Sequence, residues 1–376
     1  MKNLGIYVHI PFCVKKCNYC DFNSSSASDE VQNIYTDSLV NEIKEFGKLK
    51  KVTADTVFLG GGTPTLLGEK NLEKIITAIK ENIIIAPDNE FTIECNPKTA
   101  NLGKFRVLRD LGVNRVSLGV QSMDDEILKI LGRVHNLKDF IECFASARIA
   151  GIENINFDLM FAVPNQTEKI WQTTLETAVK LEPKHISAYG LQLEEGTYFY
   201  ENQENYKFPD DEENRRMYEL LVEFLGSKGY NRYEISNFAI PGFESRHNLK
   251  YWDLTEYVGF GLGSSSFFEG VRYQNPEVMA DYLDFADNFT PFWNGEKQSE
   301  NDLISEFMFL GLRLDKGVSD VDFKQKFGKS FFEIFKKEIA ENVEKGLLIK
   351  ENDRIYLSSK GFDLANSVMS DFLLED

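Results

Sequence analysis

The sequence lacks a long apolar run, an excess of basic residues and a set of paired cysteines. No stretch has the length and apolarity of a transmembrane helix or a signal peptide, so we expect the N-terminal residues to belong to the fold. Lys and Arg number 42 against 60 Asp and Glu, a formal net charge of −18. Because phosphate binding requires clustered basic side chains, this balance argues against a nucleic-acid partner, although an anionic small molecule needs only a local basic site.

Cysteine is scarce and unevenly placed. Three of the five cysteines lie within eight residues, which is typical of metal chemistry in a reducing compartment and not of a disulfide framework. We therefore expect a cytoplasmic protein. The 376 residues, 42% hydrophobic and 27% charged, are enough for one large globular domain and a smaller one.

The first 200 residues alternate short β-like runs with helical patterns. This alternation predicts an α/β fold with parallel strands and right-handed crossovers, either open or closed into a partial barrel. The predicted strands are Leu4–Ile10, Thr56–Leu59, Phe91–Cys95, Arg115–Val120, Asn154–Phe161 and His185–Leu191.

Beyond residue 200 the pattern changes. An acidic helix is predicted over Asp210–Lys228, and the large domain over residues 1–240. A connecting segment is predicted over 241–295, and the domain boundary is placed where residues 276–300 mix Pro, Asn and charge around Phe289–Trp293. Residues 296–376 predict helices, a short hairpin and a last helix, which is a winged-helix-like α+β module. Its 12 basic against 17 acidic residues favour packing or partner docking over DNA binding.

The most informative motif is Cys13-x3-Cys17-x2-Cys20, which directly follows the first predicted strand. Clustered thiolates suit an iron–sulfur cluster or zinc. In a cluster of four irons, three thiolates would leave one iron open to a small molecule. Zinc would need a fourth ligand, for which His9 is the nearest candidate, but structural zinc sites usually draw on two separated ligand pairs. Unligated core cysteines fit poorly in a loop that also contains Lys15, Lys16 and Asn18.

Polar and glycine residues mark the ends of the other predicted strands, and Asp158 lies within the fifth. Since the carboxyl ends of parallel strands form one functional face, we expect these residues to converge on one site. They are Gly60–Pro64, Glu94, Gln121 and Asp158, with Arg133 at the end of a helical pattern. Each alone has a plainer interpretation, as a tight turn or a solvated surface residue. Cys95 and Cys143 are interpreted as small core residues.

In their order, the cysteine motif, Gly60-Gly61-Gly62-Thr63-Pro64 and Gly119-Val120-Gln121-Ser122 resemble the radical S-adenosylmethionine (SAM) superfamily. The resemblance covers nearly the whole chain and is closest to the oxygen-independent coproporphyrinogen III oxidases and the HemW heme chaperones. It implies a partial (β/α)6 barrel with a [4Fe–4S] cluster on Cys13, Cys17 and Cys20. It places Tyr7, Gly61 and Glu94 at a first SAM, and Tyr19, Gly62, Thr63, Gln121, Arg133 and Asp158 at the positions of a second.

Two departures separate the chain from the oxidases. They have a further cysteine where this chain has Phe22, and a longer arm before the residue that matches Tyr7. His247-Asn248-Leu249-Lys250-Tyr251-Trp252 resembles instead the H-N-x-x-Y-W motif of the heme chaperones. A loop His247 would be an axial heme ligand, with Arg246 and Lys250 near the propionates. The alternative is a histidine hydrogen-bonded within a structural loop.

The resemblance thus implies a heme chaperone that carries a cluster and SAM, and delivers heme to hemoproteins such as respiratory-chain components. Contact with a membrane surface would come through membrane-bound acceptors. The alternatives are an oxygen-independent coproporphyrinogen III dehydrogenase, whose activity we do not expect here, and a radical enzyme that acts on the heme macrocycle.

Overall fold

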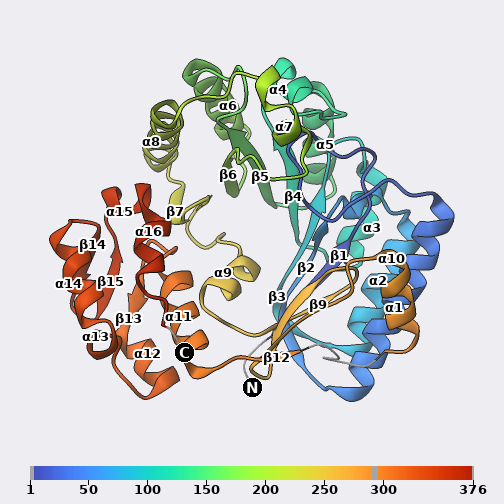
Figure 1. Cartoon of the computed structure of the whole chain (residues 1–376). Coiled ribbons are helices and arrows are strands. Elements are labelled where there is room, and N and C mark those ends of the chain that lie inside the picture. The colour runs from blue at the N-terminus through green and yellow to red at the C-terminus, as the bar shows by residue number, and fades with distance from the viewer. Residues whose placement is uncertain (1–3, 290–294, 375–376) are drawn as a thin grey trace.

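The computed structural model describes residues 4–289 and 295–374 and is built around one twelve-stranded sheet (Figure 1). Six neighbouring parallel strands form its centre and confirm the predicted α/β fold. They are β1 (Leu4–Ile10), β2 (Thr53–Gly61), β3 (Ile84–Cys95), β4 (Arg115–Gln121), β5 (Asn154–Phe161) and β6 (His185–Gly190). The sheet is an open, partial barrel, since its edge strands β12 and β7 do not pair with each other.

Helices connect the parallel strands. They are α1 (Asp29–Leu49), α2 (Glu69–Asn82), α3 (Leu102–Asp110), α4 (Asp125–Ile130), α5 (Leu137–Ile149) and α6 (Glu168–Lys180), followed by α7 (Tyr198–Glu201) and α8 (Asp211–Ser227). In α2 the residues Leu72, Ile75, Ile76 and Ile79 are all buried, as their helical spacing predicts. Capping boxes fix where α5 and α8 begin, at Asn136 and Asp210.

Both edges of the sheet carry short additional strands. Next to β6 lies β8 (Asn237–Ala239), which is antiparallel to β6. The edge strand β7 (Asn231–Glu234) follows and is antiparallel to β8. Next to β1 lies β9 (Tyr257–Phe260), which is parallel to it, and then β10 (Ser265–Phe268), β11 (Val271–Gln274) and β12 (Glu296–Lys297).

Much of the segment 241–295, which was predicted as a connection, forms helices and strands of its own. This segment contributes α9 (Arg246–Trp252), α10 (Met279–Asp287) and strands β9 to β11 to the large domain. The strands have four residues each and pair with β1 or with one another, so no local periodicity reveals them.

The C-terminal residues form the expected winged-helix-like module, at the left of Figure 1. Its elements are α11 (Glu300–Gly311), β13 (Val318–Ser319), α12 (Asp320–Phe327), α13 (Phe331–Ile334), α14 (Lys336–Glu344), β14 (Leu348–Glu351), β15 (Arg354–Leu357), α15 (Ser359–Asp363) and α16 (Ala365–Ser370). The three strands form a separate sheet, and residues such as Phe323, Phe331 and Ile355 form a separate core. The stretch used to set the boundary includes residues 290–294, which lie outside the described residues, so the boundary stays a prediction.

Ion pairs and ring contacts join this module to the sheet domain, two of them around Arg313 and Asp315. Arg313 lies over the ring of Trp252, 4.4 Å from its centroid, and Arg232 pairs with Asp315 at 2.8 Å. No helix in the described part of the chain is long and apolar enough to cross a membrane.

Candidate functional site

The predicted site residues meet at the carboxyl ends of the parallel strands, around a cavity of about 330 Å³ that we call the cluster cavity. Its walls come from the cysteine loop and from strands β2 to β6. Among the residues that line it are Cys13, Cys17, Tyr19, Cys20, Gly61, Gly62, Thr63, Glu94, Gln121, Arg133 and Asp158. Sequence reasoning therefore grouped residues that the fold does bring together.

The cysteine loop is held at both ends by backbone hydrogen bonds. The N–H of Cys13 donates to the carbonyl of Ser25, and the N–H of Ser25 donates to Pro11. In the middle of the loop, Asn18 is fixed on the end of α4. Its backbone N–H donates to Leu131 at 3.0 Å, and its side-chain amide donates to the carbonyl of Ile130 at 2.8 Å. These bonds orient the three thiols toward one cavity.

The three thiols fit a cubane cluster. All are partly exposed, free of disulfides and part of the same cavity wall. In the described part of the chain, no three His, Cys, Asp or Glu side chains converge on one metal ion. Cluster ligation does not require such convergence, because each thiolate binds its own iron. Zinc through His9 is disfavoured by its contacts, since Nδ1 and Nε2 already bond to Tyr7 and to the carbonyl of Asn23, each at 3.0 Å.

Glycines let the backbone of β2 approach this cavity. Gly61 has a φ of +106°, and a Cβ there would lie 2.5 Å from the ring of His9. A Cβ on Gly62 would lie 2.7 Å from the carbonyl oxygen of Phe12. Side chains at these positions would clash with the strand that carries the cysteine loop, so the turn requires glycine.

Two half-buried carboxyl groups, Glu94 of β3 and Asp158 of β5, line the cavity. Glu94 accepts a hydrogen bond from the N–H of Gly61 at 3.0 Å. Burial, with the charge of Asp158, raises the pKa of Glu94 to about 8. Burial also raises the pKa of Asp158, against hydrogen bonds from Ser117 and Asn156 at 2.9 and 2.8 Å. Glu94 is therefore mostly protonated at neutral pH and able to donate as well as accept hydrogen bonds.

Arg133 supplies the positive charge beside the cysteine loop. Its Nη1 donates to the sulfur of Cys17 at 3.5 Å, and its Nη2 donates to the carbonyl of Gly119 at 2.7 Å and to Asn96. A Cβ on Gly119 would lie 3.2 Å from Nη2, so glycine on β4 leaves room for the guanidinium. Arg133 thus links the end of β4 to the sulfur of Cys17.

Gln121 reaches the cavity through a distorted strand end. Its φ is +65°, and the register between β4 and β5 shifts between Gly119 and Gln121. Such a bulge redirects a side chain, and a left-handed backbone at a non-glycine residue commonly marks a functional position. Phe22 lies on the same cavity, with 62% of its surface exposed, where the oxidases are expected to have cysteine.

A second cavity of about 200 Å³, which we call the inner chamber, adjoins the first. The two share Glu94, Ser117, Asp158 and Tyr189. The remaining predicted residues, Tyr7 and His247, line this chamber together with Phe58, Arg115, Asn156, Ser187, Asn248 and Tyr251. The predicted site thus comprises two neighbouring spaces.

The expectation that His247 lies in a loop was wrong, because it lies in helix α9 and is 1% exposed. Ser245 caps this helix, and Glu90 accepts from the backbone N–H of His247 at 3.0 Å. The ring Nδ1 bonds to Thr56 and Nε2 bonds to the hydroxyl of Tyr251, each at 2.9 Å. Burial, helped by the charges of Lys250 and Arg115, lowers the pKa of His247 to about 3. His247 is therefore neutral at physiological pH.

The two basic neighbours of His247 are already paired. Lys250 lies 2.7 Å from Asp55, and Arg246 lies 3.3 Å from the same carboxylate. A propionate would have to compete with Asp55 for either residue.

Several residues of the site were not predicted from the sequence. Asn96 and Thr99 follow β3, so the rule applied to Glu94 would have found them. Arg115 and Ser117 lie within β4, where the sequence shows only strand. Cys95 and Cys143 are buried as predicted, with 3.9 Å between their sulfur atoms.

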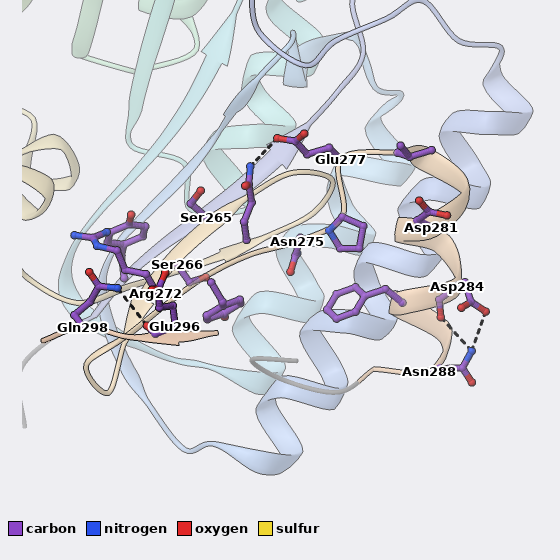
Figure 2. A pocket seen from close by; sticks show the side chains of 16 residues that line it. Ser265, Ser266, Arg272, Asn275, Glu277, Asp281, Asp284, Asn288, Glu296 and Gln298 are labelled. Carbon is purple, nitrogen blue, oxygen red and sulfur yellow. Dashed lines mark hydrogen bonds between the residues drawn. The ribbon is translucent and has the colours of Figure 1, made fainter. Parts of the chain in front are cut away.

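A larger hollow, of about 1090 Å³, lies away from this site between the β10–β11 hairpin and α10 (Figure 2). Asp281 and Asp284 face it from α10. Arg272 lines the hollow from β11 but pairs with Glu306 at 2.6 Å. We assign this hollow no function.

Comparison with known proteins agrees with this geometry. Residues 7–178 match the radical SAM superfamily, and residues 298–364 match the HemN C-terminal domain. The heme chaperone HemW of Lactococcus lactis is 39% identical over 98% of this chain and 97% of its own length. The chain belongs to the HemW family of radical SAM proteins.

Two further HemW proteins match this chain over nearly its whole length. HemW of Bacillus subtilis is 38% identical over 98% of this chain and 99% of its own length. HemW of Escherichia coli is 31% identical over 99% of this chain and 98% of its own. The coproporphyrinogen III oxidase HemN of Escherichia coli, a radical SAM enzyme of known structure, superposes with a TM-score of 0.87. The two chains are 24% identical, over 98% of this chain and 90% of the oxidase, so the match establishes the shared fold alone.

Proposed function

We propose that this chain is a heme chaperone that binds heme and passes it to hemoproteins such as respiratory-chain components. The observation that carries this proposal is the end-to-end similarity, at 39% identity, to a protein named as a heme chaperone. Phe22 adds to it, since the site lacks the further cysteine that the oxidases are expected to have.

In this proposal the cluster cavity holds a [4Fe–4S] cluster on Cys13, Cys17 and Cys20, with SAM beside it. When bound, the cluster offers SAM an open iron and a source of one electron. The polar residues expected at SAM line the same wall: Tyr19, Gly61, Gly62, Thr63, Glu94, Gln121, Arg133 and Asp158. Tyr7 faces the adjoining chamber.

The residues of this chain would bind and orient these groups. Gly61 and Gly62 let the end of β2 pack against His9 and Phe12, which fixes this wall of the cavity. Glu94, with its raised pKa, offers a neutral carboxyl group to a hydroxyl or ammonium group. Arg133 places a fixed guanidinium beside Cys17, where it compensates thiolate charge.

For heme, we propose His247 as the axial ligand. Its low pKa keeps the imidazole neutral, which is the form that binds iron. Both ring nitrogens are hydrogen-bonded, so ligation at Nε2 requires Tyr251 to release its bond. Heme binding is therefore coupled to a rearrangement of α9.

A heme titration with two matched histidine variants tests this proposal. His185 is an apt control, because it is also fully buried and bonds through both ring nitrogens, to Asn156 and to Tyr233. Its Nδ1 lies 2.6 Å from Asn156, and its Nε2 lies 2.8 Å from the hydroxyl of Tyr233. His247→Ala and His185→Ala thus remove similar side chains from similar surroundings.

We expect a Soret shift when the wild-type protein and the folded His185→Ala variant are mixed with heme, and its loss in His247→Ala. Absence of a shift in the wild-type protein would contradict heme binding. A shift that persists in His247→Ala would place the ligand elsewhere. Circular dichroism of both variants separates loss of the ligand from loss of the fold.

A further inference from the structure

Arg115 is a buried cation whose charge acts on the nearby carboxyl groups of Glu94 and Asp158 without forming an ion pair among the described residues. It is the first residue of β4, is 2% exposed, and lines the inner chamber. Its Nε has no hydrogen-bond partner among the described residues. Within that part of the chain, no carboxylate forms an ion pair with its guanidinium either. A buried charge without a partner costs several kcal/mol, so proteins rarely keep one without a functional reason.

Asn156, which lines the same chamber as Arg115, already forms hydrogen bonds with other residues. The amide of Asn156 donates to Ser117 at 2.6 Å and to Asp158 at 2.8 Å. The carbonyl oxygen of Asn156 accepts from Ser187, and it also bonds to His185 Nδ1 at 2.6 Å. This network occupies the polar groups of Asn156, and Arg115 lines the chamber with its Nε unbonded in the described part of the chain.

The raised pKa values of the neighbouring carboxyl groups reduce the negative charge that an incoming anion would meet in the chamber. Burial raises the pKa of Glu94 to about 8 and raises that of Asp158. Burial lowers the pKa of His185 and of His247, so neither adds a positive charge at neutral pH. The guanidinium is thus the strongest charge in the chamber, and a single negative charge would balance it.

We propose that the inner chamber binds the carboxylate group of an organic ligand, with Arg115 as its partner. A guanidinium is planar and donates two parallel hydrogen bonds to a carboxylate. A monoanion fits better than a phosphate dianion, because the described wall of the chamber holds one guanidinium and a dianion would leave an excess negative charge. The ligand would enter through the cluster cavity, with which the chamber shares four residues, and place its carboxylate deepest.

Two sources supply this chemistry: a small carboxylic acid, and a propionate side chain of a porphyrin. Arg115 and His247 line the same chamber, so a heme held by His247 would bring its propionates near. The site itself does not depend on heme binding, since its evidence is the buried Arg115 and the chamber.

Fluorine NMR of trifluoroacetate with the whole protein tests the site. We expect line broadening with the wild-type protein, reversal by propionate, and no reversal by chloride at the same ionic strength. Arg115→Met should abolish the broadening, and Arg106→Met, at an exposed position of α3, should retain it. If Arg115→Met does not fold, Arg115→Lys keeps the charge but not the paired donors, and binding should weaken about tenfold.

No broadening with the wild-type protein, or equal broadening with the Arg115 variant, would overturn the proposal. Addition of heme distinguishes the two sources. Displacement of trifluoroacetate assigns the site to a porphyrin propionate, and continued binding assigns it to a small acid. A protein that fails to bind heme still gives the trifluoroacetate result, so this proposal and the chaperone proposal can fail separately.

Discussion

Arg133 donates a hydrogen bond from Nη1 to the sulfur of Cys17, with 3.5 Å between the two atoms. Nη2 of the same guanidinium donates a hydrogen bond to the carbonyl of Gly119 at 2.7 Å, so the position of the guanidinium is fixed before any ligand binds. Hydrogen bonds to cluster sulfurs and nearby charge both influence the reduction potential of iron–sulfur clusters. This contact therefore connects the fold of β4 to the redox behaviour of the site.

Replacement of Arg133 by methionine should lower the reduction potential of the bound cluster. The variant loses a positive charge and a sulfur hydrogen bond, both of which favour the reduced, more negative state. We expect a decrease of about 60 mV, which corresponds to a tenfold change in a one-electron equilibrium. An anaerobic redox titration followed by electron paramagnetic resonance measures it, with Arg106→Met as the control. An unchanged potential would mean that Arg133 does not act on the cluster.

Replacement of Cys17 by serine should abolish the cluster. The variant leaves two thiolates, which cannot hold three irons of a cubane. Iron and sulfide content after anaerobic reconstitution is the measurement. Cys143→Ser is the control, since Cys143 is buried outside the cavity wall and should leave the cluster content unchanged. A full cluster in Cys17→Ser would contradict the three-cysteine site.

Replacement of Tyr251 by phenylalanine should tighten heme binding about fivefold. The hydroxyl bonds to His247 Nε2 at 2.9 Å, and loss of a hydrogen bond that must break on ligation removes a cost of about 1 kcal/mol. Tyr257→Phe is the control, because its ring packs on Tyr251 while its hydroxyl lies near Arg272. Weaker binding of Tyr251→Phe in a spectral titration would show that the hydroxyl assists heme binding instead.

Glu42 in α1 should make stability depend on pH. It is fully buried and accepts hydrogen bonds from Gly261, Asn275 and Tyr282 at 2.9, 2.7 and 2.7 Å. Burial nevertheless raises its pKa to about 7, from 4.5 in the unfolded chain. Between these values the folded state binds the extra proton. The stability that this proton supplies is complete below pH 4.5 and is lost as the pH rises through 7.

The expected result is a difference between the wild-type protein and Glu42→Gln. From pH 4.5 to 7, the unfolding free energy of the wild-type protein should fall relative to the variant. The fall should be up to about 1.4 kcal/mol per pH unit, because the variant has no proton to lose. Urea denaturation of the cluster-free protein at several pH values measures this. Parallel pH profiles, or a rise of the wild-type protein over this range, would contradict the assignment.

The sequence predicted the parallel strands well where one run of apolar residues makes a strand. The limits of β1 and β5 agree with the prediction. Strand β3 begins at Ile84, seven residues before the predicted start at Phe91, because Pro87 interrupts the apolar pattern. The structure accommodates the interruption as a bulge: Ala54 pairs with Ile85 and Thr56 pairs with Glu90, so four residues of β3, 86–89, lie opposite Asp55 alone.

Site residues at strand ends were predictable because parallel strands present their carboxyl ends on one face. This reasoning located Glu94 and Asp158. It could not locate Arg115, which begins its strand and whose burial depends on neighbouring strands. Helix α9 was missed for a different reason. Its capping residue Ser245 is visible in the sequence, but its burial depends on β2, β3 and the C-terminal module.

An assay of heme transfer tests the proposed chaperone function most directly. Heme-loaded protein is mixed with the apo form of a respiratory-chain hemoprotein, in the presence of excess apomyoglobin as a trap for free heme. The account predicts that the acceptor is reconstituted despite the trap, because heme passes between the two proteins in direct contact. Capture of all the heme by apomyoglobin, with no reconstituted acceptor, would contradict the chaperone function.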